Sequence, residues 1–398
     1  MIAESTPNFD AIEAHGLRLT EIFRRAGAEL VAPSIIQPAG LFLDVIGESL
    51  RGRTYVFTDP DGLELCLRPD LTVPACRIYL ERDPAALSTQ RFCYSGPVFR
   101  YQPHDAPAAH ARETRQAGFE TFGLTDRPAA DAEVLGVTIE ALRAAGLADF
   151  QLRMGDLGLL NAILDAQAMP SRWRRRLAHQ FWRADAFHAE LKRLVRWPAE
   201  SARGIDAALL ARLDPERPED AEAQVAEYLA SAKIDLFGTR QLAEITAGLL
   251  EAAQDTRSGP LAPAHAQLIE TYVGIVDTPR QGTNTLEALA RAAKCDIGPA
   301  LANFRRRLDL VTEAGIDIEQ ARFSGEFGRR FEYYTGFVFD LVVPALGANS
   351  PVAGGGRYDS LLQAVGAPHE VPAVGAAIYT ERLRQVLDGA ASTAGCTS

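Results

Sequence analysis

The sequence predicts an α+β fold in which an antiparallel sheet flanked by helices is interrupted by a helical domain. Alternating apolar residues on both sides of an Asp-Pro-Asp-Gly turn at 59–62 predict a β-hairpin. Segments 90–101 and 112–123 predict two longer strands joined by a polar loop. From about 157 to 316 the sequence is instead rich in Ala, Leu, Glu and Arg at helical spacing.

The remaining elements follow from end signals and periodicity. Thr6-Pro7 supplies a cap and a first-turn proline for a helix that Gly27 ends. The further expected elements are a helix at 131–147, strands at 150–154, 320–327 and 333–343, and a helix at 380–387. The predicted domains are therefore a first core part at 1–156, a helical insertion at 157–316, and a second core part at 317–398.

Composition limits the possible function classes. The chain has 398 residues, 47% hydrophobic content and a formal charge of −11, so it is globular and tRNA is not an expected partner on bulk charge. The longest uncharged run, 341–356, contains prolines and a glycine run, so no membrane association through a spanning helix is predicted. The N-terminus lacks a basic start and an apolar segment, which favours a cytoplasmic location.

Cysteine, histidine and lysine usage argues against a bound metal or cofactor. The five cysteines show no CxxC spacing, and the seven histidines show no metal-ligand pairing. Only three of the 41 basic residues are lysines, and none follows a glycine, so there is no Walker A loop. Phosphate contacts would have to come from arginine or from backbone amides.

Polar residues at the ends of the long strands are candidates for ligand contacts. Arg100 ends one strand and could bind a phosphate, although a solvated strand-end arginine is the common alternative. On the return strand, Gln116, Gly118 and Glu120 share one face by the two-residue period. An amide and a carboxylate would then flank a gap at the glycine, which could admit a small polar ligand.

Three other segments carry candidate residues. Asp70 and Thr72 follow a strand and suit an ammonium group, but either could instead cap the next helix. Tyr333 and Tyr334 lie beside a strand, where paired aromatic residues commonly form core. The run of Gly354, Gly355 and Gly356, followed by Tyr358, permits close backbone approach to a ligand but is as common in loops.

Together these segments resemble the histidyl-tRNA synthetase family of class II aminoacyl-tRNA synthetases. The resembling stretches are LRPDLT (67–72), GPVFRYQ (96–102), RETRQAGFETFG (112–123), EYYTGFVF (332–339), GGGRYDSLL (354–362) and GAAIYTERL (375–383). They appear in the family's order, from the strands of motif 2 through two histidine-specific motifs to motif 3. The resemblance therefore implies a class II synthetase-like sheet and a site for histidine.

The resemblance also implies residue roles. The histidine-binding residues would be Asp70, Thr72 and Gln116 at the amino group, Glu120 and Tyr334 at the imidazole, Arg329 at the carboxylate, and Tyr333 beside them. Arg100 and Arg382 match the two arginines around a nucleotide, and Gly354–Gly356 with Tyr358 match a glycine loop. A carboxylate facing an imidazole N–H would reject apolar isosteres, because these would leave Glu120 unpaired.

Departures from the family pattern lie mostly on the nucleotide side. Gln102 stands where the family has Glu, Leu71 and Arg330 replace glycines, and Tyr379-Thr380 replaces a motif 3 glycine. These changes add bulk or remove charge, so adenylate formation is not expected. Only 15 residues follow Leu383, so no anticodon-binding domain is expected.

A histidine-binding synthetase core without that domain resembles the regulatory subunits of ATP phosphoribosyltransferase. This resemblance implies a chain without catalytic residues that dimerises through 27–38 and assembles with the short-form catalytic subunit. L-histidine would be its feedback effector. Two alternatives remain open, namely a truncated histidine-activating enzyme and a sensor of histidine or uncharged tRNA. The arginine-rich segment 172–176 is expected to be a solvated face with Trp173 half-buried, and it receives no role.

Overall fold

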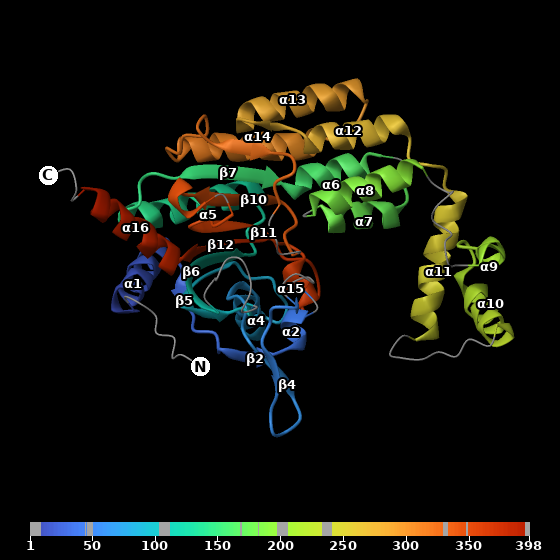
Figure 1. The fold of residues 1–398 in the computed structure, drawn as a ribbon, viewed down its shortest axis with the longest axis horizontal. Coiled ribbons are helices and arrows are strands. Elements are labelled where there is room, and N and C mark those ends of the chain that lie inside the picture. The colour runs from blue at the N-terminus through green and yellow to red at the C-terminus, as the bar shows by residue number, and fades with distance from the viewer. Residues whose placement is uncertain are drawn as a thin grey trace. The chain divides into compact units, whose positions relative to one another are not determined.

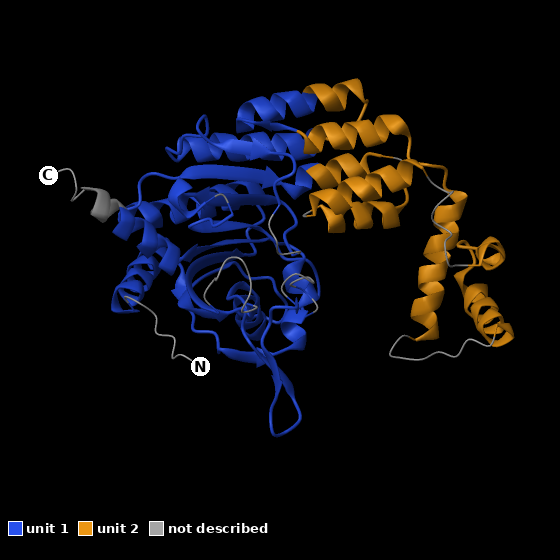
Figure 2. Cartoon of the chain, viewed as in Figure 1, with its two compact units in different colours: residues 1–159, 275–287, 298–398 blue, residues 160–274, 288–297 orange. Residues whose placement is uncertain are grey.

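The computed structural model of the chain describes residues 9–43, 45, 51–102, 112–167, 169–181, 183–196, 206–232, 241–328, 333–347 and 349–394. The chain divides into two compact units (Figure 2). Unit 1 comprises Met1–Leu159, Ile275–Glu287 and Gly298–Ser398, and unit 2 comprises Leu160–Gly274 and Ala288–Ile297. Unit 2 is therefore smaller than the predicted insertion, because most of the segment after 274 packs with the first unit.

Unit 1 is built on a nine-stranded, mostly antiparallel sheet, as the sequence predicts (Figure 1). In spatial order its strands are β1 (Glu29–Leu30), β5 (Gln90–Phe99), β6 (Glu113–Phe122), β12 (Ala373–Tyr379), β11 (Ala353–Arg357), β10 (Phe337–Val342), β7 (Gln151–Asp156), β9 (Arg322–Ser324) and β8 (Val276–Asp277). Among these described strands, only the β1–β5 and β7–β9 pairs are parallel. The α+β fold class is thus confirmed.

The predicted hairpin is confirmed as part of a separate three-stranded sheet. Its strands are β3 (Val56–Thr58) and β4 (Glu64–Leu67), which pair antiparallel, with β2 (Ile36–Pro38) on the other side of β4. Asp59 shapes the turn, since its carboxylate accepts the backbone N–H groups of residues 61 and 63. The short helix α2 (Gly40–Leu43) follows β2.

The two long strands present alternating side chains to the two faces of the sheet. On one face, Phe119 contacts Phe23 of α1 (Phe9–Arg25), with ring centroids 5.8 Å apart. On the other face, Phe122 contacts Tyr79 of α4 (Thr72–Arg82) at 5.0 Å. Glu120 shares the parity of Phe122, so the pattern directs it toward α4, inside the apolar layer.

The other helices of unit 1 include α5 (Arg127–Ala144), α14 (Gly298–Glu313), α15 (Leu361–Ala364), α16 (Thr380–Ala394) and most of α13 (Pro279–Ala292). Helix α5 begins four residues before the predicted start, because Asp126 caps it by accepting the N–H of Ala129 at 3.3 Å. Helix α1 begins at Phe9 within the described residues, so the predicted cap at Thr6-Pro7 lies outside them. Helix α15 packs against α4.

Two strand predictions and one helix prediction need correction. The strand predicted at 320–327 is only β9, three residues long, and the strand predicted at 333–343 is limited to β10. Strand β8 was predicted as helix, because two residues paired with β9 leave no periodic signal of their own.

The described residues of unit 2 form helices and the segments that connect them, without a strand. Its helices are α7 (Ser171–Gln180), α8 (Ala184–Val195), α9 (Ala207–Arg212), α10 (Pro218–Ser231), α11 (Leu242–Arg257) and α12 (Pro263–Val273), with most of α6 (Leu157–Asp165) and the end of α13 (Pro279–Ala292). Leu210, Leu213, Val225 and Ala253 form one buried cluster. In the described part of the chain, no helix is long and apolar enough to cross a membrane.

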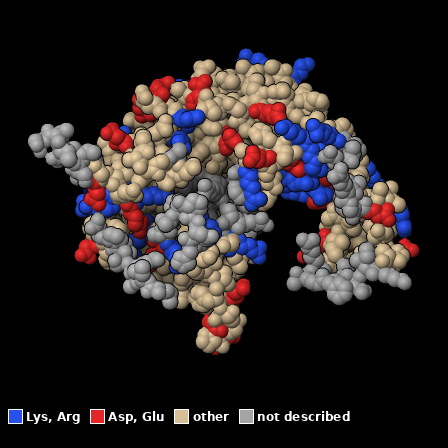
Figure 3. Space-filling model, in the orientation of Figure 1, with Lys and Arg blue, Asp and Glu red and all other residues tan. Residues whose placement is uncertain are grey.

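The arginine side chains of segment 172–176 on α7 are 31–61% exposed, as expected of a solvated face, whereas Trp173 differs from the prediction. Figure 3 shows Lys and Arg side chains gathered over α7 and α8. These arginines form ion pairs within unit 2, including Arg176 with Glu190 at 3.1 Å and Arg175 with Glu251 at 2.6 Å. Trp173 is 1% exposed rather than half-buried, because it lies on the inner face of the helix.

Candidate functional site

A buried carboxylate on β6 lies at the centre of the site. Glu120 is 1% exposed, and its Oε1 accepts hydrogen bonds from the Tyr94 hydroxyl at 2.6 Å and from Thr72 Oγ1 at 2.8 Å. Its Oε2 accepts a hydrogen bond from the hydroxyl of Tyr358. A carboxylate offers about four acceptor positions. Three hydroxyls therefore leave about one position for a ligand.

Glycine on the neighbouring strand makes room for this carboxylate. Gly375 on β12 lies opposite Glu120 in the register, and a Cβ added there would overlap Glu120 Oε2. The same Cβ would also stand 2.9 Å from the backbone oxygen of Phe119. Any larger residue at 375 would therefore displace the carboxylate.

The predicted gap at Gly118 is not open, which corrects the sequence interpretation. Tyr94 lies directly opposite Gly118 in the β5–β6 register, and its ring occupies the space that a Cβ at 118 would need. The glycine therefore accommodates an aromatic ring of the protein itself. That ring directs its hydroxyl onto Glu120, so Tyr94 is a site residue that the sequence interpretation missed.

The predicted glycine loop is a strand, which is a second correction. Gly354, Gly355 and Gly356 belong to β11, which pairs with β10 on one side and β12 on the other. A Cβ at Gly355 would overlap the backbone oxygen of Gly375, so these glycines allow close packing within the sheet rather than a flexible turn. Tyr358 follows this strand and reaches Glu120 from it.

Most of the predicted site residues line one small cavity of about 20 Å³. Those that line it are Asp70, Thr72, Arg100, Gln116, Tyr333, Tyr334, Gly354 and Tyr358. Glu120 is not among the described lining residues and lies behind Thr72 and Tyr358, which hold it. A cavity of this volume has space for about one water molecule.

Asp70 makes the helix-capping contact that was one of its two predicted roles. Its Oδ1 accepts the backbone N–H of Val73 at 3.2 Å, as a helix-capping carboxylate would, and its Oδ2 accepts the Tyr333 hydroxyl at 3.4 Å. Thr72 makes no capping bond, because its hydroxyl donates to Glu120. Tyr333 also packs against Tyr334, with ring centroids 4.9 Å apart.

The predicted arginines are distributed differently. Arg100 lines the cavity, and its Nε donates to the backbone oxygen of Pro69 at 2.9 Å. Arg382 lies in the first turn of α16, donates to the backbone oxygen of Pro351 at 2.8 Å and lies 4.3 Å over the Tyr379 ring. Arg382 is not among the described residues that line the cavity. Arg329 lies outside the described residues.

Burial strongly affects the acid–base behaviour of the two carboxyl groups. Desolvation raises the pKa of Glu120 to about 7, against the hydrogen bonds of Tyr358, Tyr94 and Thr72. Desolvation likewise raises the pKa of Asp70 to about 6, against the Val73 N–H and the Arg100 charge. A cationic group placed between them would favour their ionised forms.

These pKa shifts predict a pH dependence of stability. A folded-state pKa above the ordinary carboxyl value means that the folded chain binds the proton more tightly than the unfolded chain does. The free energy of unfolding should therefore fall as pH rises from the ordinary values to about 7. Urea unfolding at about pH 5 and about pH 7 should show a smaller fall in Glu120→Gln than in the unsubstituted chain. An equal fall in the free energy of unfolding in both proteins would contradict a raised pKa of Glu120.

The comparisons with known proteins agree with this fold. The family model described as histidyl-tRNA synthetase matches residues 4–256 and 256–383. A structure described as an ATP phosphoribosyltransferase regulatory subunit/histidyl-tRNA synthetase from Bacillus halodurans superposes with a TM-score of 0.66 at 19% identity, covering 96% of this chain and 80% of that one. A histidine–tRNA ligase subunit from Alicyclobacillus acidocaldarius gives 0.58 at 23% identity, covering 98% and 96%. The fold is thus that of the class II histidyl-tRNA synthetase-like proteins.

Relatives found by sequence identity indicate which family within this class the chain belongs to. The ATP phosphoribosyltransferase regulatory subunit of Brucella anthropi is 32% identical over 375 residues, which cover 94% of this chain and 96% of the relative. The protein of the same name from Chelativorans sp. is 32% identical over 372 residues, covering 92% and 96%. This chain belongs to the ATP phosphoribosyltransferase regulatory subunit family.

Proposed function

We propose that this chain binds L-histidine at the cavity beside Glu120 and regulates a separate, short-form ATP phosphoribosyltransferase catalytic subunit in histidine biosynthesis. In the absence of histidine the chain activates its partner, and histidine reverses the activation. The observation that carries the histidine assignment is the pair of buried carboxyls, Asp70 and Glu120, beside an aromatic cavity. The relatives' name supports the partner.

The chemistry of the pair suits histidine. The ammonium group of histidine would interact with Asp70 and Gln116, which are both 3% exposed and line the cavity. One imidazole N–H would use the acceptor position that Glu120 retains. Tyr334 would pack against the ring, since it lines the cavity and lies within 6.5 Å of the Tyr358 ring centroid. Arg329 remains our candidate for the carboxylate.

Histidine needs more room than about 20 Å³. Binding must therefore enlarge the cavity, and we propose that the hydroxyls of Thr72 and Tyr358, which line it and hold Glu120, move to expose that carboxylate. A ligand that fits only the opened arrangement shifts the chain toward that arrangement. A coupling free energy of about 1–3 kcal/mol between histidine and the partner would suffice for regulation.

We further propose that the chain is not itself catalytic. The two arginines that would contact ATP both donate to backbone oxygens, Arg100 to Pro69 and Arg382 to Pro351. Gln102 also replaces a charged residue of the synthetase pattern. The alternative, a truncated histidine-activating enzyme, predicts histidine-dependent exchange of pyrophosphate into ATP, and we expect none.

A homodimer through the region around 27–38 also belongs to this proposal. Leu30 and Ile36 are 50% and 51% exposed at the edges of their sheets, which supports a covered surface there. Sedimentation equilibrium tests the proposal. A mass of 43.1 kDa, that of one chain, would contradict it.

The deciding experiment is turnover of ATP and phosphoribosyl pyrophosphate by the short-form catalytic chain of the same organism. Rates are measured with and without this protein, at zero and saturating histidine. We expect activation by this protein and its loss with histidine. No effect under either condition would overturn the proposal. For the variant Glu120→Gln in this assay, the control is Glu113→Gln, which changes an exposed residue on the same strand. The control should behave as the unsubstituted chain.

A further inference from the structure

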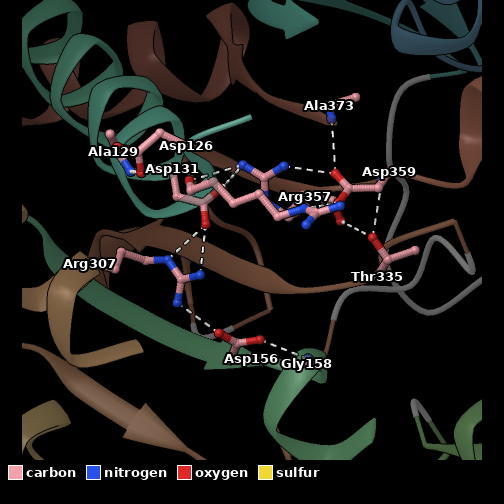
Figure 4. Close-up of polar contacts among 11 residues, drawn as sticks. Asp126, Ala129, Asp131, Asp156, Gly158, Arg307, Thr335, Arg357, Asp359 and Ala373 are labelled. Atoms are coloured by element: carbon pink, nitrogen blue, oxygen red, sulfur yellow. Dashed lines mark hydrogen bonds and ion pairs between the residues drawn. The ribbon is translucent and has the colours of Figure 1, made fainter. Parts of the chain in front are cut away.

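A buried network of ion pairs joins α5, α14 and the end of β11 (Figure 4). Asp131 on α5 is fully buried and accepts from two arginines, Arg357 at 2.6 Å and Arg307 at 2.8 Å. Arg357 also donates to Asp359 at 2.7 Å, and Arg307 on α14 donates to Asp156 at 2.7 Å. Both arginine side chains are 5% exposed.

The network is connected to the cavity through the chain itself. Tyr358, whose hydroxyl binds Glu120, stands between Arg357 and Asp359. Thr335 directly follows the cavity tyrosines, and its N–H donates to the backbone oxygen of Arg357 at 2.8 Å. Its hydroxyl accepts the N–H of Asp359 at 3.0 Å. Arg357 and Asp359, the two neighbours of Tyr358, therefore belong to the ion-pair network. Thr335, which follows Tyr333 and Tyr334, is hydrogen-bonded to both of these neighbours.

Stability alone does not explain such a network. Buried ion pairs lose most of their Coulombic gain to desolvation, and apolar residues of similar volume are often as stabilising. Their distinctive property is fixed geometry, because each charge must keep its partners. Besides its contacts with Arg357 and Thr335, Asp359 also accepts the backbone N–H of Ala373 at 2.9 Å. The observed contacts define one arrangement of the segment that carries Tyr358.

We propose that Arg357 and Asp131 are positioning residues of the cavity, which hold Tyr358 on Glu120 and make its opening a motion shared with α5 and α14. Histidine can reach Glu120 only when the Tyr358 hydroxyl moves, and Tyr358 cannot shift without its neighbours Arg357 and Asp359. Asp131 passes that shift to Arg307 on α14. The inference rests on the proposed histidine site and adds the route by which histidine binding reaches these helices.

The chain offers a matched control for this route. Asp126, the cap of α5, pairs with Arg306 of α14 at 2.6 Å, so it joins the same two helices one residue away from Arg307. This pair is exposed, with side-chain exposures of 46% and 55%. Asparagine also caps helices well, so Asp126→Asn preserves α5. Asp131→Asn is the same chemical change on the same helix, but inside the network.

The experiment measures histidine affinity by titration calorimetry and amide hydrogen exchange of α14 with and without histidine. In the unsubstituted chain and in Asp126→Asn, histidine should bind and alter exchange in α14. In Asp131→Asn, the affinity should rise at least tenfold, because the loosened network no longer holds Tyr358 on Glu120, and the exchange response should disappear. Asp131→Asn with unchanged affinity and response would overturn the inference, whereas absence of histidine binding to the unsubstituted chain would overturn the proposed site itself.

A second variant covers the case in which Asp131→Asn does not fold. Arg307→Gln leaves the pairs of Arg357 with Asp131 and Asp359 in place and removes the two ion pairs that join α14 to Asp131 and Asp156. Histidine should then bind within about threefold of the unsubstituted affinity, without the exchange response in α14. A purely structural role would lower the urea midpoint and leave that response intact. Retention of the response would overturn the inference.

Discussion

Replacing Glu120 by glutamine is expected to weaken histidine binding about 10- to 100-fold. The substitution keeps the size of the side chain, and the three surrounding hydroxyls can rotate to act as donors or acceptors. It removes the negative charge that would face the ligand's N–H. Hydrogen bonds to charged groups contribute about 1.5–3 kcal/mol, and each 1.4 kcal/mol changes affinity about tenfold. Titration calorimetry at neutral pH measures the change.

The control for this prediction lies on the same strand. Glu113 is exposed, whereas Glu120 is 1% exposed. Glu113→Gln changes the net charge by the same amount and should leave histidine affinity unchanged. A folded Glu120→Gln protein with unsubstituted affinity would exclude Glu120 from the histidine site. In the turnover assay, the same variant should still activate the catalytic subunit but resist histidine.

Replacing Gly375 by alanine should have the second large effect, on stability. The added Cβ would overlap Oε2 of Glu120, which is already held by the hydroxyl of Tyr358. The carboxylate would have to leave its position, and the hydroxyls that it holds would lose their acceptor. Overpacking of this kind costs about 1–3 kcal/mol. Urea unfolding should show this loss, and histidine binding should weaken with it.

Gly136 provides the matched control. It lies in the middle of α5, and a Cβ added there would meet no heavy atom within 4 Å. Alanine is favoured over glycine by about 1 kcal/mol within helices, so Gly136→Ala should stabilise the chain or leave it unchanged. If both substitutions changed the free energy of unfolding equally, the proposed overlap at Gly375 would be wrong.

Local sequence patterns were sufficient for the elements that carry the site. The two-residue alternation predicted β5 and β6 and placed Gln116 and Glu120 on one face, as the structure shows. The turn residues predicted the β3–β4 hairpin. These features depend on neighbouring residues, so periodicity and turn chemistry determine them. The resemblance to the histidyl-tRNA synthetase family supplied the class, which the comparisons confirmed.

The contacts within the site depended on segments that are distant in sequence. Glu120 and Tyr358 are separated by 238 positions, and Arg357 and Asp131 by 226. Local periodicity carries no information on such pairs, because strand order and register bring them together. The same reason explains the two corrections: Gly118 is covered by Tyr94 from the next strand, and the glycine run pairs between two strands.

The sequence by itself thus determined the fold class, the alternating faces of the long strands and the positions of Asp70, Thr72 and Glu120 at the ends or faces of those elements. Only the tertiary structure decided that Glu120 is buried beneath hydroxyls and that Arg357 connects the cavity to α5. The physical reason is that burial and ion pairing are properties of packed layers. Residues from β6, β11, β12 and α5 acquire their roles only when the sheet places them in contact.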